Sequence, residues 1–178
     1  FQHTNLQTTF HVNMLSLVDT VHPRVLNLKL MLEEYVKHRQ EVVKRRAEFD
    51  LKRAKERAHI LEGLVIAQTH IDEVIKIIKA SKDRDAARVN LMKRFSLSEL
   101  QTNAILDMRL SQLAALERQK LEDELKEKKK LIAELEALLA SPKKMLAVVK
   151  TEVLTLKEKY GDERRTKIMP NGIKEFSM

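Results

Sequence analysis

Residues 26–61 decide the fold, and they read LNLKLMLEEYVKHRQEVVKRRAEFDLKRAKERAHIL. The stretch contains no proline or glycine, and its apolar residues recur at steps of three, four or seven with charged residues between them. This period predicts one amphipathic helix, on the order of 50 Å long at 1.5 Å per residue. The apolar residues of the predicted seam are Leu28, Leu32, Val36, Val43, Ala47, Leu51, Ala54, Ala58 and Leu61.

A helix of this length needs a partner to cover its seam, and residues 116–140 supply one. In that segment the spacing alternates between four and three residues along Leu121, Leu125, Lys128, Ile132, Leu135 and Leu139. The residues between the two helices, 62–115, are more apolar and are punctuated by capping residues. We therefore expect an antiparallel coiled-coil hairpin whose tip carries a small helical knob, defined here as residues 62–115.

Capping signals divide the remaining chain. Gly63 is expected to loosen the end of the first helix, and Asp83 to precede a short helix that ends near residue 94. Ser98 and Gln101 have the spacing of a capping box and predict a helix over residues 99–113. Ser141 and Pro142 predict the start of a last helix, over residues 141–161, with Gly161 as its stop. Residues 1–25 are interpreted as a connector and 162–178 as a linker.

Composition supports an all-α class and excludes an all-β fold. The 178 residues include three glycines and three prolines, and 4% are aromatic, so the chain has little material for turns or strands. The lack of cysteine excludes disulfides and thiolate chemistry and favours the cytoplasm. No stretch approaches the roughly 20 apolar residues of a membrane span, so we expect no membrane partner. Since Phe1 opens the chain without a methionine, we expect a piece of a larger protein.

Catalytic and metal-ligating patterns are not apparent in the sequence. The histidines show no i,i+4 pair, so we expect no metal site, and the scattered glycines form no phosphate-binding loop. Tyr35 falls in the predicted seam and Tyr160 ends a helix, so structural roles are expected for both. We therefore assign no catalytic residue to the chain.

Basic residues concentrate on the first long helix, where Arg39, Arg46 and Arg53 are spaced by seven and share one face. Two interpretations stay open. The arginines belong to a solvated flank that pairs with Glu41, Glu48 or the glutamates of residues 122–127, or they form a DNA-facing surface that binds phosphates without sequence preference. The net charge of +8 is compatible with the second interpretation.

The knob is a candidate interface between two copies of the chain. A unit of about 50 residues buries little apolar surface by itself, so part of its apolar surface is expected to meet a partner. The candidate interface residues are Leu97, Gln101, Ile105, Met108, Arg109 and Leu113.

Several longer motifs, in this order, resemble the A subunit of bacterial type IIA DNA topoisomerases, that of DNA gyrase before that of topoisomerase IV. They are HTNLQTTF at 3–10, NMLSLVD at 13–19, PRVLNLK at 23–29, HRQEVVKRRAEFDL at 38–51, AHILEGL at 58–64, AILDMRLSQLAALE at 104–117 and YGDERRT at 160–166. The resemblance implies that the helical hairpin is the coiled-coil arm that leaves the DNA breakage-reunion core. It also implies that the knob is the C-gate, the exit gate where two A subunits meet.

The same resemblance implies further expectations. The catalytic tyrosine of this family lies in an Arg-Tyr motif upstream, so the chain is expected to be inactive alone. ATP and Mg²⁺ would belong to other parts of the enzyme. The implied partners are a second copy of the chain, double-stranded DNA and the B subunit, in the bacterial cytoplasm with the chromosome. The alternative is a stand-alone coiled-coil adaptor or a basic nucleic-acid-binding arm.

Overall fold

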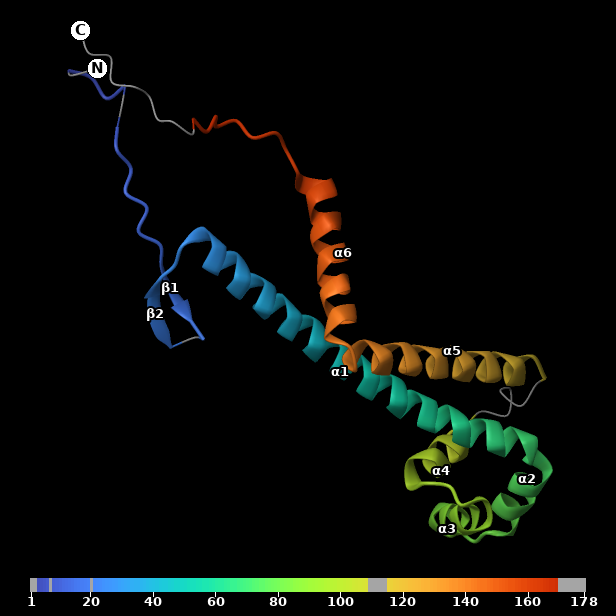
Figure 1. The fold of residues 1–178 in the computed structure, drawn as a ribbon. Helices are drawn as coiled ribbons and strands as arrows, with labels where there is room; N and C mark the ends of the chain where they lie inside the picture. Colours follow the sequence, from blue (N-terminus) through green and yellow to red (C-terminus); the bar gives the residue numbers. More distant parts are fainter. Residues whose placement is uncertain (1–2, 7, 20, 109–114, 170–178) are drawn as a thin grey trace.

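The computed structural model of the chain describes residues 3–6, 8–19, 21–108 and 115–169, with residues 115–117 described by their backbone only. Most of the described residues are helical, which confirms the predicted helical class, and one small two-stranded sheet is added to it. Figure 1 shows a long helical hairpin with a cluster of short helices at one end, and a further helix that rises at an angle from the end of the shorter hairpin helix, beside the middle of the longer one.

Helix α1, Leu28–Thr69, has 42 residues and is therefore about 60 Å long. Asn27 caps it, because its side chain accepts a hydrogen bond from the backbone N–H of Leu30 at 2.9 Å. The predicted end at residue 61 is wrong, since α1 continues through the buried Gly63. Glycine inside a helix costs about 1 kcal/mol relative to alanine. Here it permits close packing, because a Cβ at this position would lie 2.7 Å from the Cβ of Gln101.

Helix α5, Ala115–Leu139, packs antiparallel along the C-terminal part of α1 (Figure 1). The predicted seam is therefore covered over only part of its length. Leu28, Leu32 and Val36 are exposed, and so is Tyr35 of the same predicted seam. The 25 residues of α5 are too few to cover the 42 residues of α1. The buried residues of the seam are Val43, Ala47, Ala54, Ala58 and Leu61.

The knob is formed by the last turns of α1 together with α2, Ile71–Ala80, α3, Arg84–Phe95, and α4, Glu99–Leu106. The predicted cap of α3 is present, since the side chain of Asp83 accepts from the backbone N–H of Ala86 at 2.7 Å. The knob has a small apolar core of its own. Its buried members are Ala67, Val74, Leu91, Leu97 and Ile105, with Leu64, Ile77, Phe95 and Leu106 packed around them.

Helix α4 begins as predicted and ends earlier than predicted. Both hydrogen bonds of the Ser98–Gln101 capping box are formed. The predicted extension to residue 113 is wrong, because α4 ends at Leu106 and Asp107 caps it. The carboxylate of Asp107 accepts from Arg84 at 2.7 Å, so a contact with α3 fixes the residue at which the chain leaves the helix. Residues 109–113 of the predicted helix lie outside the described residues.

Helix α6, Pro142–Tyr160, crosses α1 and buries Val149 (Figure 1). Proline at its first position matches the predicted start, but the side chain of Ser141 makes no capping hydrogen bond. Gly161 ends the helix with its N–H bonded to the carbonyl of Lys157 at 2.8 Å. Its φ of −69° is extended rather than left-handed, so the conformational freedom of glycine does not explain this end.

The predicted connector contains a β-hairpin that the sequence analysis missed. Strands β1, Leu15–Val18, and β2, His22–Val25, are antiparallel, with Leu17 opposite Pro23. Asp19 follows β1 with a φ of 53°, a left-handed conformation that aspartate tolerates better than most residues. Proline inside a strand, and a strand pair of four residues each, give little periodic signal. An ion pair between Asp19 and Lys37, at 3.5 Å, joins the hairpin to α1.

Gly63→Ala separates helix propensity from packing. Propensity alone predicts stabilisation by up to about 1 kcal/mol, because alanine is the better helix former. The 2.7 Å approach to Gln101 predicts instead a loss of about 1–3 kcal/mol in the free energy of unfolding. Urea denaturation followed by circular dichroism measures the change, with the exposed Lys52→Ala as control. A stabilised Gly63→Ala chain would contradict the close packing of α4 on α1.

Candidate functional site

The knob holds the candidate interface residues, and the structure places three of them inside its core. Leu97 and Ile105 are 5% and 4% exposed, so they are not available to a partner. Gln101 is also buried, and its amide donates to the backbone carbonyl of His59 at 2.7 Å, which ties α4 to α1. Met108 is half-buried, and Arg109 and Leu113 lie outside the described residues.

The apolar side chains that the knob does expose include Leu100 and Val89, at 67% and 44%. Leu100 lies five residues before Ile105, which on a helix places the two on different sides, about 140° apart. Leu100 is not among the predicted interface residues, although its rotation from the buried side of the helix can be read from the sequence. Arg88 precedes Val89 on α3, and Glu99 precedes Leu100 on α4. An ion pair at 3.1 Å between Arg88 and Glu99 joins the two helices. The exposed side of α3 and α4 is therefore one accessible surface of the knob, and it carries apolar side chains.

Two of the candidate DNA-facing arginines bind one carboxylate on α6. Arg39 and Arg46 each donate to Glu152, both at 2.5 Å and each to a different carboxylate oxygen. The hydrogen bond from Arg46 is the largest cause that lowers the pKa of Glu152, and Arg39 adds to it against the opposing effect of burial. Neither open interpretation of the arginines named this partner. The ion pairs of Arg39 and Arg46 with Glu152 therefore hold α6 against α1.

Arg53 differs from the other two arginines. Its guanidinium lies 5.8 Å from the centre of the ring of Phe49, within the range of a cation–π contact. No ion pair joins Arg53 to another residue in the described part of the chain. Of the three arginines, Arg53 is thus the one whose charge stays open to an external anion.

Charges along the two long helices pair with each other. Arg57 donates twice to Glu124, at 2.7 and 2.8 Å, and these hydrogen bonds hold the pKa of Glu124 below its usual range. This pair matches the first interpretation of the basic run, in which it pairs with glutamates of residues 122–127. Ion pairs between α1 and α5 include Arg57–Glu124, Lys55–Glu136 and Glu62–Lys129.

The described residues offer no constellation for catalysis or metal binding. Among residues 3–6, 8–19, 21–108 and 115–169, no group of three histidine, aspartate or glutamate side chains could hold a metal ion. Tyr35 and Tyr160 are exposed, and Lys159 lies 5.2 Å from the ring centre of Tyr160. None of the described helices has the length and apolar character that crossing a bilayer requires.

Comparison with known proteins covers nearly the whole chain. Residues 1–154 match the family of the DNA gyrase/topoisomerase IV A subunit. The DNA gyrase A subunit of Clostridium acetobutylicum is 54% identical over 168 residues, which is 94% of this chain and 20% of that protein. Those of Brachyspira hyodysenteriae and Dehalogenimonas lykanthroporepellens are 53% and 52% identical, over 95% and 99% of this chain and 20% and 22% of theirs. The chain thus spans about one fifth of the length of these relatives.

Glu152→Gln tests whether the shared carboxylate holds α6 in place. Folding lowers the pKa of Glu152 from a usual value of 4.5, so its charge stabilises the folded form above pH 4.5 and this contribution is lost as the pH falls through the lowered pKa. We expect α6 amides at pH 7 to be less protected from hydrogen exchange in the variant than in the parent chain. The difference should shrink below about pH 4.5.

The control is Glu48→Gln, which removes an exposed carboxylate paired with Lys44 at 4.0 Å. It should leave the protection of α6 unchanged. Equal protection of α6 in the parent and the Glu152→Gln chains at pH 7 would show that the two arginines do not hold the helix.

Proposed function

Because the chain belongs to the family of the DNA gyrase/topoisomerase IV A subunit, we propose that it is the coiled-coil arm and C-gate of a type II DNA topoisomerase. In this proposal two copies meet through their knobs to hold the exit gate shut. The two arms then bound the cavity that the transported DNA duplex crosses during ATP-dependent supercoiling or relaxation. The B subunit is the further protein partner, and ATP and Mg²⁺ act in other parts of the enzyme.

The observation that carries the proposal is the unbroken length of α1. Its 42 residues place the start of the knob, at residue 62, about 50 Å from the start of the helix, and the knob has its own apolar core. α5 returns along the same helix, so the arm is a two-helix strut for the part that joins the knob. A strut with a separate folded unit at its tip suits a gate that must stand away from the reaction centre.

The exposed side of α3 and α4 supports the choice of a second copy as the partner of the knob. Leu100 and Val89 expose apolar surface there, and Leu97, Gln101 and Ile105 underneath fix the helix that presents Leu100. We propose that this surface replaces those three buried residues in the candidate interface. In a two-fold dimer the same patch on each copy would meet its counterpart.

The alternative, a stand-alone adaptor or a nucleic-acid-binding arm, is not adopted. The family match covers residues 1–154, which include the hairpin, the knob and most of α6. An independent adaptor would not be expected to match proteins about five times its length with an identity near 50%.

Leu100→Glu tests the gate surface. Two buried carboxylates facing each other across a dimer would repel, so the 178-residue chain should be dimeric at micromolar concentration and the variant monomeric by light scattering. Leu154→Glu on α6 is the matched control, because Leu154 is 51% exposed and lies outside the knob. It should leave the dimer intact.

The same two changes in the full-length parent protein, combined with the B subunit, connect the gate to activity. We expect Leu100→Glu to reduce ATP-dependent strand passage and Leu154→Glu to leave it largely unchanged. If the 178-residue chain without substitutions stays monomeric at high micromolar concentration, this would contradict the proposed gate.

A further inference from the structure

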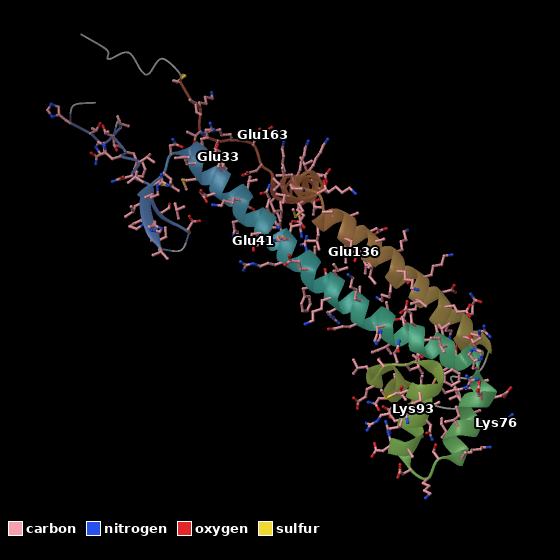
Figure 2. The ribbon with its side chains drawn as sticks, turned by 60° about the horizontal axis from the view of Figure 1, so that its bottom comes forward. Glu33, Glu41, Lys76, Lys93, Glu136 and Glu163 are labelled. Carbon is pink, nitrogen blue, oxygen red and sulfur yellow. The ribbon has the colours of Figure 1, made fainter. Side chains whose placement is uncertain are left out.

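Helix α6 presents lysines on the side that faces away from α1. Met145, Val149 and Glu152 are buried or half-buried and mark the inner side of the helix. At 100° per residue, Lys143, Lys150 and Lys157 fall roughly on the opposite side, and all three are exposed. Figure 2 looks nearly along α6 and shows its long side chains spreading away from α1.

These lysines differ from most cations of α1 and α5 because they lack ion-pair partners among the described residues. The cations of the two long helices include many with a carboxylate within 4.0 Å, such as Lys55, Arg57 and Lys129. No carboxylate of the described chain pairs with Lys143, Lys150 or Lys157. Glu152, the acid on the inner side of α6, is taken by Arg39 and Arg46.

The region around α6 also carries a net positive charge. Residues 142–169 carry a net charge of +4, which is half of the +8 of the whole chain in about one sixth of its length. Beyond α6 the chain continues with exposed Arg164, Arg165 and Lys167. α6 and the segment after it are therefore a second basic region of the chain, beside residues 37–57 of α1, whose net charge is +5.

We infer that the outer side of α6 binds the phosphate backbone of duplex DNA through Lys143, Lys150 and Lys157. A spacing of seven residues separates neighbouring lysines by about 10 Å along the helix, and the three together span about 21 Å. That length matches about six base pairs of duplex at 3.4 Å each. Lysines act as point charges toward phosphates, so this contact carries no sequence preference.

The inference rests on the proposed function for its ligand, since a DNA topoisomerase acts on duplex DNA, but it does not depend on the gate. The outer side of α6 also exposes Leu146 and Leu154. Leucines beside lysines would also suit an acidic protein surface, which is the competing partner. The salt dependence of duplex binding distinguishes DNA from such a protein.

The experiment measures binding of the 178-residue chain to a fluorescent 30-base-pair duplex between 50 and 200 mM salt. The test variant is K143E/K150E/K157E. The matched control is K52E/K76E/K126E, which reverses three exposed lysines that also make no ion pair in the described part of the chain and lie on α1, α2 and α5. Lys76, labelled in Figure 2, lies on the knob, far from α6. Circular dichroism checks that both variants keep their helices.

We expect the α6 variant to bind about tenfold or more weakly at 50 mM salt. Each lost phosphate contact changes the slope of log affinity against log salt by about 0.9, so three contacts make it less steep by about 2.7. The control should stay within about twofold of the parent chain. If the reversed α6 does not fold, K143Q/K150Q/K157Q should show the same change of slope.

Three results would overturn the inference: no binding of the duplex by the parent chain, equal loss in the test and control variants, or an unchanged slope in the α6 variant. An unchanged slope would leave the acidic protein surface as the partner of α6. Light scattering on the same samples measures the oligomeric state, so the proposed gate is tested separately from DNA binding by α6. A monomeric chain that loses DNA binding only when α6 is changed would contradict the gate and support the inference.

Discussion

Close packing of α5 on α1 is the contact on which the rest of the structure depends. α1 buries mainly small side chains in its seam, among them Ala47, Ala54 and Ala58, and small residues let two helices approach closely. The seam stiffens the half of α1 that leads to the knob, and the knob is built on the end of that same helix. Without the seam, α1 would be a long helix with an uncovered apolar stripe and no fixed position for the knob.

Short sequence patterns predict those elements that depend on residues close together in the chain. The alternation of apolar residues predicts the hairpin, and the capping box of Ser98 and Gln101 predicts the start of α4. Contacts between residues far apart in the chain cannot be predicted from such patterns. α1 continues through Gly63, where the missing side chain leaves room for Gln101 to pack closely. Arg39 binds a carboxylate 113 residues away. The β-hairpin is missed because Pro23 hides β2 and the strands are short.

The candidate site shows the same division between pattern and packing. Apolar periodicity selects Leu97 and Ile105, and such periodicity marks the buried side of a helix, so these residues lie in the core of the knob. An exposed apolar side chain lies instead on the opposite side, at Leu100. The arginine repeat predicts one shared surface, yet Arg39 and Arg46 both pair with Glu152, whereas Arg53 lies over Phe49. Many cations of the arm are thus paired with carboxylates, whereas, in the described part of the chain, Arg53 and the lysines on the outer side of α6 are not.

Distances between two copies of the chain test most directly whether the knobs meet and the arms diverge. The chain has no cysteine, so single cysteines can carry spin labels at Lys93 on the knob or at Glu33 near the start of α1, both labelled in Figure 2. Pulsed electron resonance on each labelled dimer gives the distance between copies. A gate formed by the knobs predicts a shorter distance between the labels at Lys93 than between those at Glu33. The reverse order, or no measurable distance between copies at Lys93, would contradict it.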